Sequence, residues 1–332
     1  MESERIYNIL VTGGSGFIGW NFLKNLFNKN LLKYNVVVNI DAGDYSAINT
    51  MDLSTEKYKF YNGRMKDLSE SIIDNYNIDL IINFAAHTHV DNSLKGISDF
   101  VNNNVLEMSI LAENARRKWE EKNVKGLFLQ ISTDEVFGSL EDQGGIPFNE
   151  YTLHHPNNPY SATKSAAEVI LRSFMHTYNF PAIITNCSNN YGPGQHTEKL
   201  IPKIISNCLN KKTIPIYGDG NQCRDWLHVD DHCEGIALAV KNGIVGNSYL
   251  FGNNSVVSNL EITKKICRII DSKINSLTPS ESLIEFVTDR LGHDRTYMVD
   301  YTRSLVDLGW SPNTSLEIGL ENTVDWYLNK LI

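Results

Sequence analysis

Residues 127–138 read Leu127-Phe-Leu-Gln-Ile-Ser-Thr-Asp-Glu-Val-Phe-Gly138, an apolar run that ends in polar and acidic residues. The run predicts a buried strand of a parallel sheet. Ligands of open α/β sheets bind beyond the carboxyl ends of the strands, so we expect Thr133, Asp134 and Glu135 in a functional site. Adjacent acids also occur at helix N-termini, where they complement the helix dipole. The pair alone therefore leaves a purely structural role open.

The segment Tyr160-Ser-Ala-Thr-Lys164 favours the chemical interpretation. Pro159 predicts the start of a helix that runs to about Tyr178. Tyr160 and Lys164 are four residues apart and therefore share one face of this helix. An ammonium group near a phenol favours the phenolate and lowers its pKa. Tyr160 is therefore a candidate base near neutral pH.

The N-terminal segment has the pattern of a dinucleotide-binding unit. Residues 7–11 predict a short buried strand, and an amphipathic helix is expected to follow through about Phe27. Between them lie Gly13, Gly16 and Gly19. Glycines at this spacing permit a tight turn, a close approach of the backbone to a pyrophosphate and close packing of helix on strand. The helix N-terminus would then face the phosphates.

The second strand supplies a candidate for nucleotide selectivity. Residues 36–40 predict this strand, and it ends at Asp41. A carboxylate at this point accepts hydrogen bonds from the adenosine ribose hydroxyls and repels a 2′-phosphate. Asp41 therefore favours NAD over NADP. Residues 60–61 predict the third strand.

The fourth predicted strand, 78–84, is followed by small residues and two histidines. Ala85 and Ala86 allow a cofactor to approach the strand end closely. His87 and His89 are potential metal ligands, but no third ligand with metal-site spacing follows. The sequence therefore predicts no metal.

Strands and helices alternate as far as a sixth predicted strand at 182–185. This pattern predicts an α/β fold, a Rossmann-type doubly wound parallel sheet with a smaller C-terminal α/β substrate-binding part. We expect an NAD-binding domain over residues 1–185 and a second domain over 186–332, with interleaved segments. Candidate ligand residues of the second part are Asn189, Lys199, Arg224, His228 and the segment Asp289-Arg-Leu-Gly-His-Asp-Arg295, and the arginines and lysines among them suit a diphosphate.

The composition excludes several other classes of protein. The 332 residues are 42% hydrophobic and 21% charged, which is ordinary for a globular chain. A formal net charge of −9 disfavours nucleic acid or an anionic membrane as the main partner. No apolar run reaches the length of a membrane span, no signal-peptide pattern opens the chain, and the five cysteines include no CxxC pair. We therefore expect a cytoplasmic location.

These residues together resemble the extended short-chain dehydrogenase/reductase superfamily and, within it, the nucleotide-sugar 4,6-dehydratases. The resemblance covers almost the whole chain. The Thr-Asp-Glu triplet separates these dehydratases from most epimerases and decarboxylases of the superfamily. The most specific segments are Ser132-Thr-Asp-Glu-Val136, Tyr160-Ser-Ala-Thr-Lys164, Ser188-Asn-Asn-Tyr-Gly-Pro193, Glu198-Lys-Leu-Ile-Pro202, Tyr217-Gly-Asp-Gly220, Arg224-Asp-Trp-Leu227 and Gly292-His-Asp-Arg295.

The resemblance implies a reaction on dTDP- or UDP-glucose. Tyr160, helped by Lys164, takes the C4 hydroxyl proton while hydride passes from C4 to tightly bound NAD, and Thr133 hydrogen-bonds the C4 oxygen. Glu135 then removes the C5 proton, and protonated Asp134 gives a proton to the leaving C6 hydroxyl. Two adjacent carboxyl groups can divide such acid and base roles when their pKa values are pushed apart. Hydride return to C6 gives a 4-keto-6-deoxy sugar nucleotide.

The resemblance also implies binding residues and an assembly. A homodimer is expected through helices at 97–119 and 160–178. The expected NAD site comprises Gly13, Gly16, Phe17, Ile18, Gly19, Asp41, Asp67, Leu68, Ala85, Ala86, Tyr160, Lys164 and Asn190. The expected sugar-nucleotide site comprises Thr88, Thr133, Asn189, Lys199, Leu200, Pro215, Tyr217, Arg224, Asn259 and His293.

Three alternatives remain at this point. The chain departs from the family pattern at Glu107-Met108, where Gly-Thr is usual, and at Gly194, where a bulkier residue is usual. An enlarged pocket would accept an N-acetyl group, so a UDP-N-acetylglucosamine 4,6-dehydratase, with or without 5-epimerase activity, is one alternative. A sugar-nucleotide 4-epimerase needs Tyr160 and Lys164 but no acidic pair. A non-catalytic NAD-binding regulator is the third.

Overall fold

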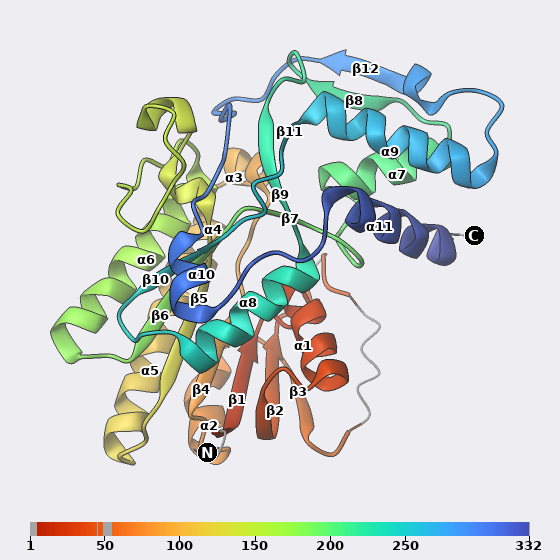
Figure 1. Ribbon diagram of the computed structural model, residues 1–332. Coiled ribbons are helices and arrows are strands. Elements are labelled where there is room, and N and C mark those ends of the chain that lie inside the picture. Colours follow the sequence, from red (N-terminus) through yellow and green to blue (C-terminus); the bar gives the residue numbers. More distant parts are fainter. Residues whose placement is uncertain (1–4, 45, 49–54, 332) are drawn as a thin grey trace.

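A computed structural model describes residues 5–44, 46–48 and 55–331 (Figure 1). Its main sheet has the strand order β10-β6-β5-β4-β1-β2-β3, and all neighbouring strands in it are parallel. The strands are β1 (Ile6–Thr12), β2 (Lys33–Asp41), β3 (Tyr58–Asn62), β4 (Leu80–Asn83), β5 (Leu127–Thr133), β6 (Ala182–Cys187) and β10 (Ser248–Phe251). The predicted Rossmann-type sheet is confirmed, and the order of its strands reverses between β1 and β4.

Helices cover both faces of this sheet (Figure 1). Successive residues of a strand point to opposite faces, so Ile9 and Val11 enter one buried core and Leu10 enters the other. This double burial explains the nearly continuous apolar runs of the strands. The first core includes residues of α1 (Phe17–Lys29), α8 (Val229–Asn242) and α10 (Thr302–Leu308), and the second includes residues of α2 (Met65–Asn75), α5 (Met108–Glu121) and α6 (Pro159–Tyr178).

A second lobe lies above the carboxyl edge of the sheet in Figure 1 and has its own apolar core. Its helices are α7 (Leu200–Leu209), α9 (Asn259–Ile274) and α11 (Leu316–Leu331). Two small sheets accompany them, with the orders β11-β9-β7 and β12-β8. Their strands are β7 (Asn189–Tyr191), β8 (Ile214–Tyr217), β9 (Cys223–His228), β11 (Val256–Ser258) and β12 (Ile284–Val287).

One strand of the main sheet comes from the C-terminal half of the sequence. β10 pairs with β6 from Ser248↔Ile184 to Phe251↔Cys187, and all four of its residues are buried. The strand closes one edge of the sheet, although it lies within residues 186–332. With four residues, β10 is too short for the hydrophobic pattern of the sequence to predict which sheet it joins.

The predicted helix at 97–119 is not regular. It consists of α4 (Ser98–Phe100), a π-helix η1 (Val101–Glu107) and α5. The wider turn of a π-helix changes which side chains face inward, and such turns are frequent at functional sites. In η1, Asn103, Asn104 and Glu107 are buried. A simple helical period does not predict this inward group of polar side chains.

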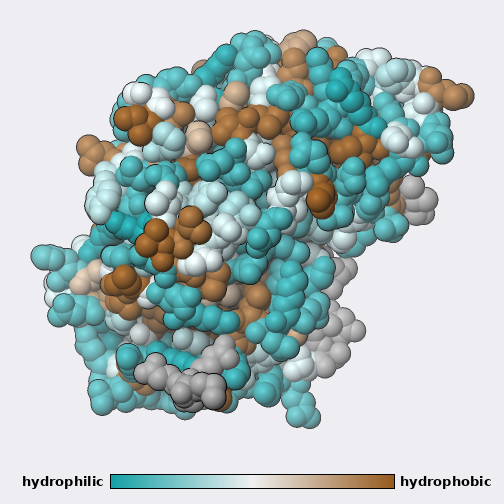
Figure 2. All heavy atoms as spheres, in the orientation of Figure 1, coloured by the Kyte–Doolittle hydropathy of each residue, from teal (hydrophilic) through white to brown (hydrophobic). Residues whose placement is uncertain are grey.

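The surface is mostly polar. Figure 2 shows separate hydrophobic patches among hydrophilic residues on the face of Figure 1. Within the described part of the chain, none of the helices combines the length and the apolar character needed to cross a membrane.

Candidate active site

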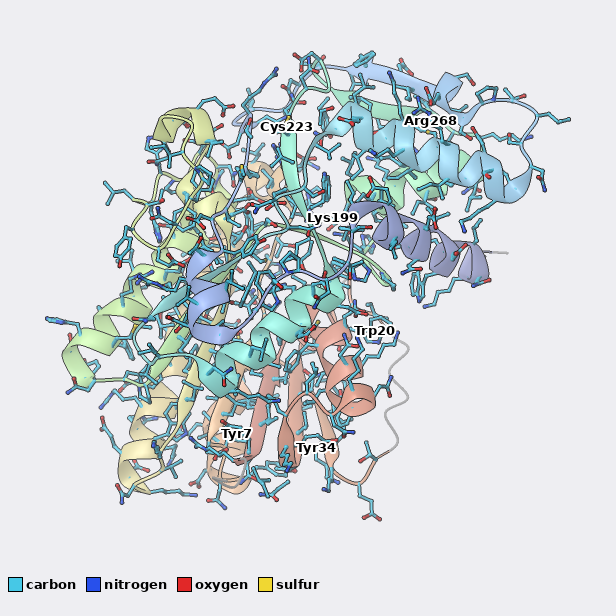
Figure 3. The ribbon with its side chains drawn as sticks, in the orientation of Figure 1. Tyr7, Trp20, Tyr34, Lys199, Cys223 and Arg268 are labelled. Carbon is cyan, nitrogen blue, oxygen red and sulfur yellow. The ribbon has the colours of Figure 1, made fainter. Side chains whose placement is uncertain are left out.

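Three cavities with shared walls lie beyond the carboxyl ends of the main strands. The loop cavity, about 90 Å³, is lined by Gly13, Asp41 and Arg64 among others. The central cavity, about 230 Å³, lies against Thr133 and the glycine loop. The outer cavity, about 260 Å³, lies between the two lobes and shares Lys199 with the central one. In Figure 3, Lys199 is labelled where the lobes meet.

The glycine loop packs tightly between β1 and the end of β4. Gly13 has φ +70°, and a Cβ there would lie 2.6 Å from the backbone of Ala85. Gly16 is the N-cap of α1, where no side chain caps the helix. The N–H groups at the start of α1 are therefore free for an anion such as a pyrophosphate. Together these features fit a dinucleotide.

We predict that Gly13→Ala removes most of the bound dinucleotide, because the added methyl group would displace the loop from Ala85. Dinucleotide released from the purified, denatured protein measures the effect. Gly144→Ala is the matched control, since Gly144 has φ +75° but open space around its Cβ position. The control should lose only about 1–2 kcal/mol of stability to the left-handed backbone. Full dinucleotide content in Gly13→Ala would contradict the prediction.

Asp41 is held at the end of β2 by backbone hydrogen bonds. Its Oδ2 accepts from the N–H of Ser15 and its Oδ1 from the N–H of Gly43, each at 2.8 Å. The carboxylate therefore joins the glycine loop to the strand end. Its position in the loop cavity is the one that the sequence predicts for a ribose-binding acid.

The cavities contain most of the predicted cofactor residues, but Asp67 and Leu68 are not among their lining residues. These two lie in the first turn of α2, where Leu68 packs on the core. The residues that directly follow β3, Gly63-Arg-Met65, line the loop cavity instead. Their position immediately after a strand is the signal that could have identified them. The predicted cofactor residues that do line the loop or central cavity are Gly13, Gly16, Phe17, Ile18, Gly19, Asp41, Ala85, Ala86, Tyr160, Lys164 and Asn190.

Thr133, Asp134 and Glu135 lie together at the end of β5, which is buried throughout. Asp134 begins a short 3-10 helix, η2 (Asp134–Phe137). The Thr133 hydroxyl donates to Asp134 Oδ1 and accepts from the N–H of Glu135, both at 3.3 Å. Asp134 Oδ2 and Glu135 Oε2 are buried, and neither has a hydrogen-bond partner among the described residues. Two carboxyl oxygens are thus available to a ligand.

The two carboxyl groups have different electrostatic environments. Burial, with the charges of Glu135 and Asp225, raises the pKa of Asp134 well above its ordinary value. Burial also raises the pKa of Glu135, but the cations Arg290, Lys199 and Arg224 oppose that rise. Asp134 is therefore suited to hold a proton, and Glu135 is suited to accept one.

Tyr160 and Lys164 also line the central cavity, from the first turns of α6. The expected lowering of the tyrosine pKa by the lysine is not observed. Burial, with the charge of Glu135, raises the pKa of Tyr160 well above its ordinary value. Lys164 directs its Nζ to the carbonyl oxygen of Ile131 at 2.7 Å, and burial lowers its pKa to about 8. The phenol needs a further positive charge nearby to ionise at neutral pH.

A buried carboxylate connects α6 to the Thr133 strand. Asn186 donates one hydrogen bond to Glu168 Oε1 at 2.7 Å and one to the carbonyl oxygen of Thr133 at 3.0 Å. Burial alone would raise the pKa of Glu168, but His154, whose Nε2 lies 3.4 Å from Glu168 Oε2, helps to keep that pKa below its ordinary value. The charged carboxylate thus fixes β5, β6 and α6 relative to one another.

The outer cavity is rich in cationic and polar side chains. Lys199 donates to the carbonyl oxygen of Thr88 at 3.0 Å. Arg224 donates to the carbonyl oxygens of Cys223, Asp294 and Arg295, so its guanidinium is largely engaged. Besides Thr133 in the central cavity, the predicted substrate residues are found here: Thr88, Asn189, Lys199, Leu200, Pro215, Tyr217, Arg224, Asn259 and His293.

Arg290 is a cavity residue that is not among the substrate residues implied by the family resemblance. It lines the outer cavity, and its Nε is buried with no hydrogen-bond partner among the described residues. In the sequence, its only signal was its place in the charged segment 289–295, whose arginines suit a diphosphate.

The two histidines after β4 face carboxylates. His87 Nε2 lies 3.7 Å from Asp44, and His89 Nε2 lies 3.6 Å from Glu198. Within residues 5–44, 46–48 and 55–331, no group of three His, Cys, Asp or Glu side chains is arranged to hold a metal ion.

The chain is similar to known proteins over nearly its full length. The family described as GDP-mannose 4,6 dehydratase matches residues 10–323. The dTDP-glucose 4,6-dehydratase of Xanthomonas campestris is 42% identical over 96% of this chain and 92% of its own. That of Haemophilus influenzae is 42% identical over 97% and 98%. The crystal structure of the dTDP-glucose 4,6-dehydratase DesIV of Streptomyces venezuelae, which has NAD bound, is 34% identical over 97% of both chains, with a TM-score of 0.87.

The sequence matches far exceed what a shared fold alone would give, and they include the strand ends that carry the acidic pair and the glycine loop. The chain belongs to the family of nucleotide-sugar 4,6-dehydratases within the extended short-chain dehydrogenase/reductase superfamily.

Proposed function

We propose that this protein dehydrates dTDP-glucose to the 4-keto-6-deoxy sugar nucleotide with tightly bound NAD. The two relatives that are 42% identical to this chain are both named dTDP-glucose 4,6-dehydratase. The observation that carries the proposal is the pair Asp134 and Glu135. Asp134 is buried and Glu135 half-buried beside the central cavity, each has a buried carboxyl oxygen with no hydrogen-bond partner among the described residues, and their different surroundings fit one acid and one base.

Residues of the loop and central cavities fit NAD. The glycine loop and the uncapped N-terminus of α1 suit the pyrophosphate, and Asp41 suits the adenosine ribose. Tyr160 and Lys164 would then lie at the nicotinamide end, in the central cavity. When bound, oxidised NAD supplies a hydride acceptor and a positive charge on its nicotinamide ring.

Each proton transfer of the reaction is assigned to a different side chain of the central cavity. Tyr160 takes the proton of the C4 hydroxyl, and the Thr133 hydroxyl orients that oxygen. Loss of the C4 hydride as well, to the acceptor that bound NAD would supply, leaves a C4 ketone, which makes the C5 hydrogen acidic. Glu135 removes it, because the three nearby cations oppose its protonation. Asp134 holds its proton until it passes to the leaving C6 hydroxyl, because burial disfavours its charged form.

The outer cavity suits the nucleoside diphosphate. Lys199 and Arg290 supply positive charge, and the unpartnered Nε of Arg290 is ready to donate to a phosphate oxygen. We assign substrate binding mainly to residues 186–332 and cofactor binding mainly to 1–185, with β10 as the interleaved segment.

We predict that Arg290→Met raises KM for the sugar nucleotide by about 10- to 100-fold, the loss of one charge-assisted hydrogen bond. NAD content should stay unchanged, since Arg290 lines the outer cavity and not the loop cavity. Arg268→Met is the matched control, because Arg268 pairs with Glu281 on the exposed side of α9. It should leave KM unchanged. Equal KM values in Arg290→Met and wild type would exclude this role.

The side chains around the central cavity argue against the two other classes of function, a 4-epimerase and a non-catalytic regulator. A 4-epimerase does not need the acidic pair, yet here each carboxyl group has one buried oxygen without a hydrogen-bond partner among the described residues, which lowers stability. A purely regulatory protein has no need of Thr133, Asp134, Glu135, Tyr160 and Lys164 around one cavity.

The proposal includes a homodimer in a cytoplasmic setting. Apolar side chains on η1 and α6, which pack together, are exposed: Val101 by 41%, Leu106 by 50% and Val169 by 57%. A second copy that covers this face would bury them. Light scattering of the purified protein tests the dimer, and a monomer at micromolar concentration would exclude it.

The cysteines support the cytoplasmic setting. All five are free thiols, as expected in a reducing compartment.

The proposal is tested with purified protein and no added NAD. The protein is offered dTDP-glucose, UDP-glucose or UDP-N-acetylglucosamine separately in heavy water, and the products are read by NMR. We expect a 4-keto-6-deoxy product from dTDP-glucose with deuterium at C5. A product that keeps its C6 hydroxyl would identify an epimerase instead. Turnover of only the N-acetyl substrate would move the assignment to that alternative.

A further inference from the structure

Glu107 is a buried acid that the proposed reaction does not use. It lies in the last turn of the π-helix η1 and is 4% exposed. Its Oε2 is buried and has no hydrogen-bond partner among the described residues. A buried carboxyl oxygen without a partner costs free energy, so a ligand that donates a hydrogen bond to it is favoured.

Glu107 lines the loop cavity and also a neighbouring, wider cavity of about 790 Å³ that shares Asp44, Arg64 and Asn103 with this end of the fold. The inference rests on the proposed function, in which the loop cavity holds the adenosine half of NAD. Asp41 marks the ribose, and the glycine loop and Tyr160 mark the path towards the nicotinamide end. Arg64, Met65 and Glu107 line the same cavity as Asp41 and do not line the central cavity that contains Tyr160. Of the parts of NAD, the adenine base is the one that this assignment leaves for them.

The other polar side chains of this end are already engaged. Arg64 donates to Asn103 Oδ1 at 3.2 Å and lies 3.8 Å from Asp44. Asn103 donates in turn to Asn104 Oδ1 at 3.1 Å. Asn104 is bound to the backbone N–H and carbonyl of His87. Among the described residues, Glu107 is thus the buried polar side chain of η1 that still has a free acceptor.

We propose that Glu107 accepts a hydrogen bond from the exocyclic amino group of the adenine in bound NAD. This amino group is the only strong hydrogen-bond donor on the adenine ring, and a carboxylate is an acceptor without a donor. The geometry of η1 brings Glu107 inward, since the wider π-helical turn adds a residue to the inner face of the helix. Glu107 is therefore a specificity-determining residue for the base of the cofactor.

The test is a competition between NAD and nicotinamide hypoxanthine dinucleotide, which has a carbonyl oxygen in place of the amino group. Purified holoprotein is incubated with an equimolar excess of both until the resident nucleotide has exchanged. The bound nucleotides are then released by denaturation and quantified by chromatography. Wild-type protein should prefer NAD by about tenfold or more, because the carbonyl oxygen would face a carboxylate.

Two substitutions change this ratio in different ways. Glu107→Ala should bring it close to one, because it removes the acceptor from both complexes. Glu107→Gln, which keeps the size of the side chain, should also remove or reverse the preference, because its amide N–H₂ can donate to the hypoxanthine oxygen. Glu113→Gln is the matched control on the next helix, where Glu113 pairs with Arg116 outside the three cavities, and it should keep the wild-type ratio.

The outcomes separate this inference from the proposed function. A wild-type ratio in both Glu107 variants would overturn the role of Glu107 and leave NAD binding intact. Failure of wild-type protein to hold either dinucleotide would overturn the cofactor site itself and the inference with it. The ratio is measured within one sample, so a partly unfolded variant still reports the preference of its folded fraction.

Discussion

Glu135→Gln is expected to stop exchange of the substrate C5 hydrogen with solvent and to lower turnover by about 10²- to 10⁴-fold, the usual contribution of a positioned base. An amide cannot take the proton that the carboxylate takes. Oxidation at C4 does not need this side chain, so reduced NAD should accumulate when substrate is added. Stopped-flow absorbance and NMR in heavy water measure the two effects separately.

The controls for this variant are the neighbouring acid and a distant one. Asp134→Asn should retain C5 exchange and lose release of the C6 hydroxyl, because only the proton donor is removed. Glu120→Gln, at an exposed carboxylate paired with Arg116, should behave as wild type. If the C5 hydrogen of the Glu135→Gln complex exchanges at the wild-type rate, another group is the base.

The same assignment predicts the pH dependence of turnover. Glu135 must be ionised, so activity is lost as the pH falls through its pKa, which burial raises above the ordinary value. Asp134 must be protonated, so activity is lost as the pH rises through its pKa, which burial raises further. The profile is therefore bell-shaped, and Asp134→Asn should remove the part of the alkaline limb that belongs to this group.

Tyr160→Phe is expected to block the reaction before either acid acts, again by about 10²- to 10⁴-fold. Without the phenol, the C4 hydroxyl keeps its proton and hydride transfer is not assisted. Neither reduced NAD nor C5 exchange should be seen, since exchange requires the C4 ketone. This pattern differs from that of Glu135→Gln, in which the ketone still forms. Single-turnover absorbance and NMR in heavy water distinguish the two.

A matched substitution lies at the other end of α6. Tyr178→Phe removes a phenol that is 47% exposed and packs on Phe174, far from the cavities. It should leave turnover unchanged. NAD content in Tyr160→Phe should remain near that of wild type, because the glycine loop and Asp41 are intact. Unchanged turnover in Tyr160→Phe would exclude its role as the base and favour a non-catalytic protein.

The fold follows from short-range patterns. Apolar runs of strand length, the glycine spacing and the helix start at Pro159 depend on residues close together in the chain, and each element they predicted is present. The asparagine before that proline completes the start signal, since Asn158 and Ser161 form a capping box. Strand order then follows from chain connectivity and handedness, which leave few topologies for alternating strands and helices.

These local sequence patterns predict only part of the site. Thr133, Asp134 and Glu135 are contiguous, so the sequence places them together. Arg290 and Glu107 line cavities that form only when segments far apart in the chain pack together. The spacing of residues in the sequence cannot predict such packing. The resemblance directed attention to Asp67 and Leu68, whereas the chain leaves β3 at Gly63 and presents Arg64 and Met65 to the loop cavity.

The sequence by itself determined the parallel sheet, the dinucleotide loop and the identity of the acidic pair, because these depend on local periodicity and on side-chain chemistry. Only the tertiary structure decided the inward turn of η1, the insertion of β10 beside β6 and the electrostatic environment of each acid. A pKa depends on the burial and the charges around a group, and these are set by residues from several elements at once. For that reason the roles that we propose for Asp134 and Glu135 depend on the folded protein and not on the sequence alone.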